Sequence, residues 1–196
     1  MKVFYRKINH GIEVLRCFQE DSEIWIPAEI DGLPVVRIGD YAFSSCNSLT
    51  EVTLPKSLKG IHAAAFRECL TLGKVLFLGE NVDKIGNHAF QGCRELTEIT
   101  IPPEITTLQT SLFNGCTGLE KIVVPWGVGL VMDYVFKGCA GLKEIQFESG
   151  YTEISKYSLE GIPDDTAIAV EGRRLAKRPE PEQTVMLKDV IVLEES

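Results

Sequence analysis

Five cysteines recur at one fixed place in the sequence, and the thiol is the most reactive side chain in that pattern. Each follows a phenylalanine in the arrangement Phe-x-x-Cys. They are Cys46, Cys69, Cys93, Cys116 and Cys139. Thiols can bind zinc, form disulfides or act as nucleophiles when a neighbouring base activates them. Their spacing decides which of these reactions is open to them.

Zinc binding and nucleophilic catalysis both fit the pattern poorly. Zinc sites usually draw on C-x-x-C or close Cys/His pairs, and the sequence has no C-x-x-C. The only histidines are His10, His62 and His88, and they do not occupy equivalent positions. Five equivalent thiols also do not resemble one activated nucleophile. Phosphate-binding, nucleophile-elbow and metalloprotease motifs are absent. We therefore expect no enzyme activity, no cofactor and no metal.

Disulfides are the stronger alternative. Stacked repeats would place equivalent Cα atoms about 4.8 Å apart, which a disulfide tolerates, but their Cβ atoms would stay farther apart than the preferred ~3.8 Å. Five members also cannot all pair. We favour small, buried core residues over a disulfide ladder. Cys17 lies outside the pattern and is the candidate for a reactive thiol.

The phenylalanines show that the whole chain is repetitive. They recur at Phe43, Phe66, Phe90, Phe113 and Phe136, in steps of 23, 24, 23 and 23 residues. A leucine follows each cysteine by three residues, and an aliphatic residue precedes each phenylalanine by five. Each unit also has an alternating apolar pair, such as Ile99 and Ile101. This alternation predicts one strand per unit and, with incomplete first and last copies, seven parallel strands.

The repeats resemble a known family. The stretch L-T-E-I-T-I-P, a short I-x-x-I-G and then A-F-x-G-C are similar to BspA-like leucine-rich repeats, over about residues 23 to 170. Leu78-Gly79, Glu148 and Ile162 depart from that pattern. The combined prediction is a β-rich solenoid. It is a leucine-rich-repeat-like, right-handed coil of about six to seven repeats, with one parallel sheet and short helical turns at A-F-x-x-C. The resemblance implies a bacterial or protozoal protein, often at the cell surface, that binds other proteins or host matrix.

The ends of the solenoid need covering. We expect a β-hairpin cap over residues 1–22, the solenoid over 23–170 and a second cap over 171–196. Arg173, Arg174, Lys177 and Arg178, in the second cap, form the only basic cluster along the sequence.

Charge and hydropathy exclude some partners. The net charge is −8, which opposes general nucleic-acid binding and docking on an anionic membrane. No apolar run approaches the roughly 20 residues of a membrane-spanning helix. The chain as given begins without a signal peptide, so it reads as cytoplasmic, although members of the family are often at the cell surface.

The strand residues that point away from the core are the candidate binding surface. They form two columns, and from Glu51 onward the charge in the first column alternates in sign. The candidates are Trp25, Glu51, Thr53, Lys74, Leu76, Glu98, Thr100, Lys121, Val123, Glu144 and Gln146. The alternation also has a purely structural explanation, since like charges repel in an in-register sheet.

We interpret the chain as a non-catalytic protein-binding module, a monomer or weak oligomer. A scaffold that assembles through the ends or edges of the solenoid is the alternative, and a carbohydrate-binding module is a weaker one.

Overall fold

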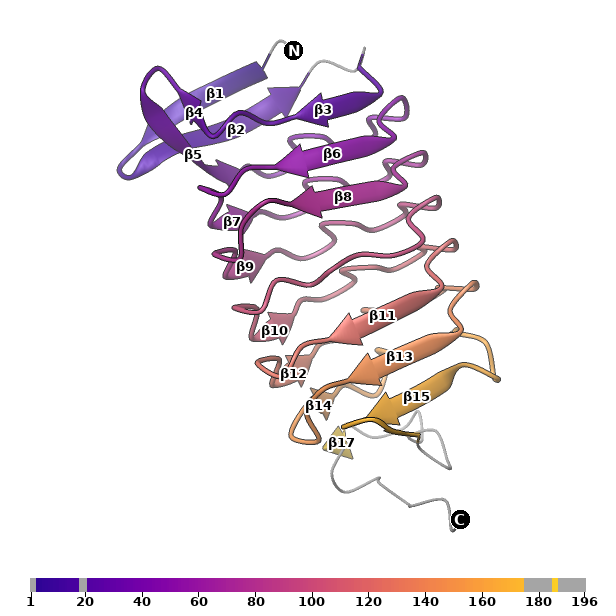
Figure 1. The fold of residues 1–196 in the computed structure, drawn as a ribbon. Helices are drawn as coiled ribbons and strands as arrows, with labels where there is room; N and C mark the ends of the chain where they lie inside the picture. The colour runs from indigo at the N-terminus through magenta and orange to yellow at the C-terminus, as the bar shows by residue number, and fades with distance from the viewer. Residues whose placement is uncertain (1–2, 18–20, 175–184, 187–196) are drawn as a thin grey trace.

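The computed structural model describes residues 3–17, 21–174 and 185–186 of the chain. The chain winds into a β-solenoid of about seven turns, whose coils stack from the N-terminus to the C-terminus (Figure 1). Each complete coil has three sides, which we call the front face, the back face and the turn face. The front face carries the predicted strands, the back face carries shorter ones, and the turn face carries the Phe-x-x-Cys segments.

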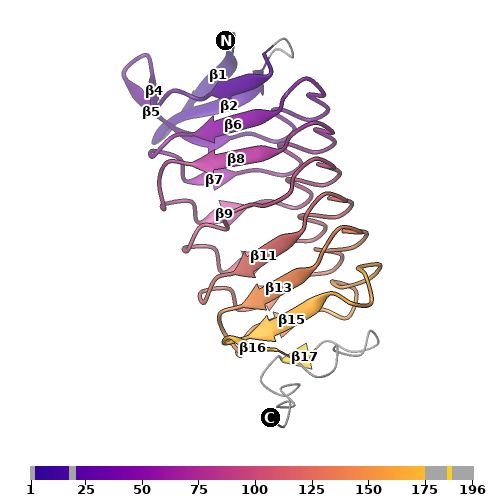
Figure 2. The same cartoon turned by 45° about the vertical axis from the view of Figure 1, so that its right-hand side comes forward.

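The front face consists of two parallel sheets rather than the single sheet predicted. The strands are β3 (Glu23–Trp25), β6 (Glu51–Leu54) and β8 (Lys74–Phe77) in the first sheet, and β11 (Lys121–Val124), β13 (Glu144–Phe147) and β15 (Ala167–Val170) in the second. Between β8 and β11, residues 98–101 follow the same path without forming a strand (Figure 2). The sheet is thus interrupted at one coil.

Prolines contribute to this interruption. At the end of the front face, the N–H groups of Leu78, Glu148 and Glu171 donate to a carbonyl of the preceding coil. Pro102, at the end of the interrupted coil itself, and Pro125, in the next coil, stand at that place and have no N–H. The interrupted coil therefore lacks this hydrogen bond to both of its neighbouring coils. The coil of β6 lacks it on one side only, because Leu78 N–H donates to Leu54 on the other side.

The back face carries a second row of strands that the sequence analysis did not predict. After β5 (Leu33–Ile38) they are two residues long: β7 (Gly60–Ile61), β9 (Lys84–Ile85), β10 (Thr107–Leu108), β12 (Leu130–Val131) and β14 (Glu153–Ile154). Each contributes one inward aliphatic residue, such as Ile61 or Ile85. One inward residue per strand gives no alternation in the sequence, so the aliphatic residue five positions before each phenylalanine was recognised as part of the repeat but not as a strand.

The turn face is a continuous ladder of backbone hydrogen bonds. The N–H of Phe43, for example, donates to the carbonyl of Ala65 in the next coil at 2.7 Å. The residue two before each phenylalanine is left-handed, with φ between 53° and 62° at Tyr41, Ala64, His88, Ser111 and Tyr134. The residue two after each phenylalanine also has positive φ, at Ser45, Glu68, Gly92, Gly115 and Gly138. The predicted short helical turns are therefore not confirmed: these segments are successions of reverse turns.

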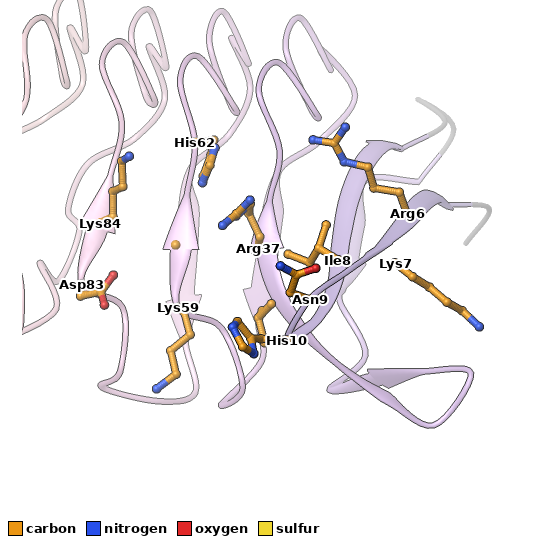
Figure 3. Close-up of a pocket in the computed structure, with 12 residues that line it drawn as sticks. Arg6, Lys7, Ile8, Asn9, His10, Arg37, Lys59, His62, Asp83 and Lys84 are labelled. Carbon is orange, nitrogen blue, oxygen red and sulfur yellow. The ribbon is translucent and has the colours of Figure 1, made fainter.

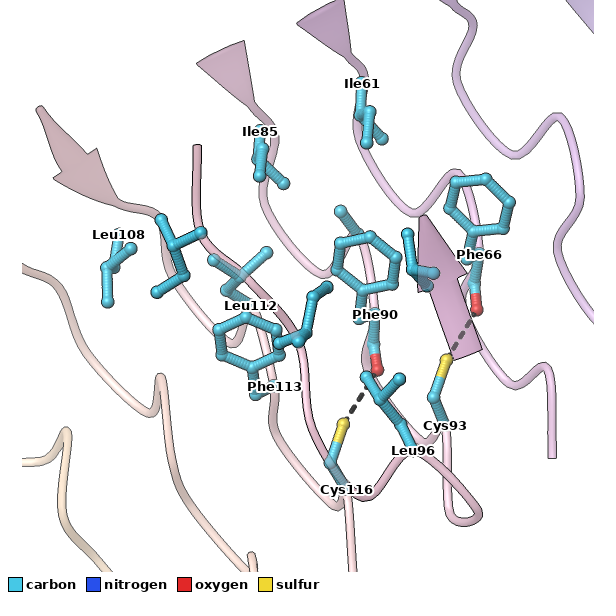
Figure 4. Packing of buried hydrophobic residues seen from close by; sticks show 14 of the residues in the cluster. Ile61, Phe66, Ile85, Phe90, Cys93, Leu96, Leu108, Leu112, Phe113 and Cys116 are labelled. Atoms are coloured by element: carbon cyan, nitrogen blue, oxygen red, sulfur yellow. Dashed lines mark hydrogen bonds between the residues drawn. The ribbon is translucent and has the colours of Figure 1, made fainter. Parts of the chain in front are cut away.

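Phenylalanine rings and thiols fill the core behind this ladder. Adjacent rings of the five repeat phenylalanines stack with centroids 4.9 to 6.1 Å apart and interplanar angles of 5° to 11°. The Sγ atoms of Cys69, Cys93, Cys116 and Cys139 each donate to the phenylalanine carbonyl of the preceding coil, at 2.9 to 3.1 Å. Figure 4 shows two of these bonds, from Cys93 to Phe66 and from Cys116 to Phe90. The cysteines are thus both small core residues and hydrogen-bond donors.

Short strands lie at both ends of the coil stack. At the N-terminus, β1 (Val3–Ile8) and β2 (Gly11–Cys17) form an antiparallel hairpin, and β2 runs parallel to β5. A second hairpin joins β4 (Glu29–Ile30) to β5 through Asp31 and Gly32, both of which have positive φ. At the C-terminus, β16 (Arg173–Arg174) pairs with β15, and β17 (Val185–Met186) pairs with β14. The ladder edges of β5, β14 and β15 are thus covered.

The phenylalanine stack predicts a large stability effect at its middle ring. Phe90→Ala should lower the free energy of unfolding by about 3–5 kcal/mol, because it removes a fully buried ring between two others. Cys93→Ala should cost about 1 kcal/mol, because it removes one thiol hydrogen bond. Urea unfolding followed by circular dichroism measures both. Leu78→Ala, at a side chain 44% exposed, is the control and should change the free energy by less than about 0.5 kcal/mol. Equal losses for Phe90→Ala and Leu78→Ala would contradict the prediction.

Candidate binding surface

The strand register places most of the predicted surface residues in two columns on the front face. Glu51 lies beside Lys74, and Lys121 lies beside Glu144. In the second column Trp25, Thr53 and Leu76 are neighbours in one sheet, and Val123 and Gln146 in the other. Glu98 and Thr100 lie between the two sheets, in the segment that forms no strand. The columns thus exist, and they are interrupted at the same coil as the sheet.

Charges on the front face are largely compensated within it. Lys74 Nζ lies 3.2 Å from a Glu51 carboxylate oxygen, and Lys121 Nζ lies 2.9 Å from Glu144. Such exposed pairs contribute at most about 1 kcal/mol each. Glu98, in the segment that forms no strand, has no cation within 4.0 Å among the described residues, and the neighbouring lysines pair with Glu51 and Glu144 instead. Binding energy at this face must therefore come mainly from apolar contacts and hydrogen bonds.

Apolar side chains at the front face are unevenly exposed. Trp25 is 65% exposed and Val123 is 36% exposed, whereas Leu76 is half-buried. Trp126, just beyond β11, is 72% exposed, and its backbone N–H donates to the Glu148 carboxylate at 3.0 Å. Exposed aromatic and aliphatic side chains within a polar surround are typical of protein interfaces.

A groove lies where the front sheet is interrupted. Its volume is about 570 Å³, and it is lined by six of the predicted residues: Lys74, Leu76, Glu98, Thr100, Lys121 and Val123. Ile99 and Ile101 contribute to its floor, and Pro103 and Pro125 to its end. The volume falls within the usual range of about 300–1,000 Å³ for binding pockets. The interruption therefore turns a flat sheet surface into a concave one.

Sequence reasoning missed the prolines of this groove and Glu148. The stretch Pro102-Pro103 occurs in one repeat only, and this was the available signal that the coil differs from its neighbours. The other five predicted residues lie on the same face but outside the groove lining: Trp25, Glu51, Thr53, Glu144 and Gln146.

The repeat cysteines are buried free thiols. Burial raises the pKa of Cys69 and of Cys139 to about 12, and it raises the pKa of Cys93 and Cys116 well above the ordinary value. They stay protonated at neutral pH and are poor nucleophiles. Nothing is described of the Cys17 side chain, and the side chains of Arg173, Arg174, Lys177 and Arg178 also lie outside the described residues. Within the described part, no three His, Cys, Asp or Glu side chains are grouped to hold a metal ion.

Comparisons with known proteins connect this fold to a family. The family model described as BspA type leucine rich repeat region matches residues 36–164 in six copies. The crystal structure of a T. pallidum leucine rich repeat protein is 31% identical, with a TM-score of 0.71, over 74% of this chain and 68% of that one. A search of curated proteins finds no match. Among the described residues, no helix has the length and apolar character needed to cross a membrane.

Two further crystal structures are similar in fold alone, because their identity to this chain is below 25%. The pneumococcal vaccine antigen PcpA is 18% identical, with a TM-score of 0.72, over 98% of this chain and 48% of that one. A leucine rich cell surface protein from Faecalibacterium prausnitzii is 24% identical, with a TM-score of 0.59, over 99% and 41%. This chain therefore spans less than half the length of either protein.

The raised thiol pKa values predict slow alkylation and alkaline sensitivity. In native protein at pH 8, iodoacetamide should leave Cys69, Cys93, Cys116 and Cys139 unmodified, and denaturant should expose all four, as peptide mass spectrometry will show. The unfolded thiol ionises near pH 9.0 and the native Cys69 near 12. The free energy of unfolding should therefore be independent of these thiols below pH 9 and fall as the pH rises toward 12. Rapid native alkylation at Cys93 would contradict this prediction.

The interrupted coil predicts uneven hydrogen exchange. The amides of residues 98–101 donate no hydrogen bond to either neighbouring sheet, so they should exchange at least about tenfold faster than the amides of β6 and β13. Exchange read by NMR or mass spectrometry tests this. The amide of Phe90, which donates to Leu112 at 3.1 Å on the turn face of the same seam, is the internal control and should be protected. Equal protection at Ile99 and Val52 would show that the front sheet is continuous.

Proposed function

Because the chain belongs to the BspA-type leucine-rich repeat family, we propose that it binds a protein through the front face of its solenoid. The single observation that carries this proposal is the groove of about 570 Å³ that opens where the sheet is interrupted, within the predicted surface. Membership of this repeat family suggests a protein-interaction module. The front face is the side of the described molecule on which an exposed aromatic, a concave floor and compensated charges occur together.

The partner we propose is a folded protein or extended segment with apolar side chains that enter this groove. Leu76 and Val123 stand on its two walls, and Ile99 and Ile101 lie in its floor. The lining residues include no aromatic ring, and sugar-binding sites usually rely on such rings for stacking. This composition favours a protein over a carbohydrate as the ligand.

The proposed place of action is a bacterial cell surface. Two structurally similar proteins are described as a cell surface protein and a vaccine antigen, and both are longer than this chain. We extend that setting to this chain, with adhesion to another cell or to host matrix as the biological role. Fractionation of the native cells with an antibody to this protein tests the location, and recovery only in the cytosol would overturn it.

Replacing the apolar side chains of Leu76 and Val123, which line the groove, with polar ones should strongly weaken partner binding. We expect Leu76→Ser with Val123→Ser to weaken capture of partner proteins by at least about tenfold, because apolar anchors dominate interface energies. Immobilised protein is exposed to extracts and host matrix proteins, and captured proteins are quantified by mass spectrometry.

The matched control for this experiment is Tyr41→Ser. Tyr41 is 60% exposed on the turn face, and its replacement should leave capture unchanged. Thermal unfolding confirms that each variant is folded. Equal capture by the wild type and by the front-face variant would place the binding site elsewhere.

A further inference from the structure

A second groove lies on the opposite side of the molecule, where the N-terminal hairpin meets the back face (Figure 3). Its volume is about 740 Å³. Five cationic side chains line it, Arg6, Lys7, Arg37, Lys59 and Lys84, against one carboxylate in the lining, Asp83. Arg6 and Lys7 lie in β1, Arg37 lies in β5, Lys59 immediately precedes β7, and Lys84 lies in β9. The five cations are thus spread over nearly 80 positions of the sequence. A positive groove is unexpected in a chain with a net charge of −8.

The floor of this groove has a gap between two cations. Arg37, Gly60 and Lys84 are direct neighbours in the register of β5, β7 and β9. Two strand spacings of about 4.8 Å place the Arg37 and Lys84 backbones roughly 9.6 Å apart. Gly60 between them has no side chain, and a Cβ built there would meet no atom closer than 3.7 Å. A small group therefore fits above Gly60, in ordinary van der Waals contact with Lys84 and His62, and positive charge flanks this place on both sides.

Part of this positive charge is already compensated. Arg6 and Arg37 both contact Glu13, whose side chain is only 3% exposed, with Arg37 Nη1 at 3.8 Å. Lys7 lies 3.5 Å from Asp31, and its side chain points away from the other cations in Figure 3. Lys59 and Lys84 have no carboxylate within 4.0 Å among the described residues. These two lysines, with the remaining N–H donors of Arg37, are available to an external anion.

We propose that this groove, which we call the basic groove, binds an acidic segment of a protein, with one carboxylate above Gly60 between Arg37 and Lys84. Lys59 and the Asn9 amide at the hairpin turn are placed to contact a neighbouring acidic or carbonyl group. This site is separate from the front-face groove, and the proposal does not depend on the front face.

The chemistry of the lining favours an acidic peptide over a nucleic acid or a sulfated polysaccharide. The lining contains no Phe, Tyr or Trp ring on which a base or sugar could stack, and the rings it does contain are the imidazoles of His10 and His62. Asp83 stands among the cations and would repel a ligand that is anionic at every unit. The net charge of −8 repels a dense polyanion as well. A peptide with a few carboxylates, one of them matched to the gap at Gly60, avoids these penalties.

His62 reports on occupancy of the site. Burial and then the charges of Arg37 and Lys84 lower its pKa, while Asp40, whose Oδ1 lies 3.8 Å from His62 Nδ1, and Glu13 raise it. An anion placed between Arg37 and Lys84 offsets their charge at His62. Binding should therefore raise the pKa of His62, and by linkage affinity should increase as the pH falls toward the pKa of the bound state.

The first experiment uses a fluorescein-labelled, end-capped peptide in which three glutamates alternate with three glycines, and it measures fluorescence anisotropy at low salt. We expect sub-millimolar binding that weakens when NaCl is raised from about 50 to 200 mM, and no binding of the same peptide with glutamine in place of each glutamate. Gly60→Glu places a carboxylate in the gap and should abolish binding. Gly129→Glu adds the same charge at an exposed glycine on a distant coil, with no atom within 4 Å of its Cβ, and should leave binding within about twofold of the wild type apart from general repulsion.

The second experiment removes the free cations. Lys59→Gln and Lys84→Gln are both exposed changes, and each should weaken peptide binding about two- to fivefold. Lys74→Gln and Lys121→Gln, on the front face, are the matched controls and should have no such effect. These variants keep the test decisive even if Gly60→Glu does not fold, and they separate this site from the front-face site.

The third measurement follows His62 by NMR. Its pKa should rise when the glutamate peptide is added and should not change when the glutamine peptide is added. The proposal is overturned if the peptide does not bind, if Gly60→Glu binds as well as the wild type, or if the front-face lysines matter equally. It is also overturned if inorganic phosphate or a sulfated oligosaccharide binds more tightly than the peptide, because the site would then be one for a compact or dense anion.

Discussion

The ladder on the turn face is the constraint on which the rest of this solenoid depends. A residue with positive φ stands two before each phenylalanine and another stands two after it. In the first four coils the N–H groups of these two residues and of the phenylalanine donate to the next coil. The carbonyl of each repeat phenylalanine accepts a hydrogen bond from the cysteine N–H of its own coil. In four coils the same carbonyl also accepts a hydrogen bond from the cysteine thiol of the next coil. A left-handed non-glycine residue costs roughly 1–2 kcal/mol. The ladder and the stacked rings must exceed that cost in every coil, which explains why the phenylalanine and cysteine recur so strictly.

Both candidate surfaces exist because this ladder leaves the two sheet faces free to vary. On the back face one sheet ends at β9 and another begins at β10, so these two strands are not paired. On the front face the strands are interrupted between β8 and β11. On the turn face the backbone ladder is continuous between these two coils, where the N–H groups of His88, Phe90 and Gly92 donate to carbonyls of the next coil at 2.8 to 3.1 Å. One continuous hydrogen-bond ladder is therefore enough to keep these coils stacked. The front-face groove then forms where strand pairing is missing, and the basic groove has its gap where a side chain is missing.

The sequence predicted the features that repeat and missed those that occur once. The strict spacing of Phe43 to Phe136 was sufficient for the solenoid, its core and the outward columns of the front face. Helical turns were predicted because A-F-x-x-C has helical spacing, yet glycine stands two residues after the phenylalanine at Gly92, Gly115 and Gly138, each with positive φ. That glycine was the available signal for a left-handed turn. The basic groove was out of reach, because Arg37, Gly60 and Lys84 differ from one another and meet only when the back strands are in register.

The two surfaces differ in the physical origin of their binding energy. On the front face Lys74 and Lys121 are each paired with a glutamate of the same sheet, so an approaching partner meets little net charge. Attraction there must come from buried apolar area, which salt affects weakly. In the basic groove Lys59 and Lys84 have no paired carboxylate among the described residues, so attraction is electrostatic and screened over about 10 Å at 0.1 M salt. Two partners, or two parts of one partner, can therefore be told apart by ionic strength alone.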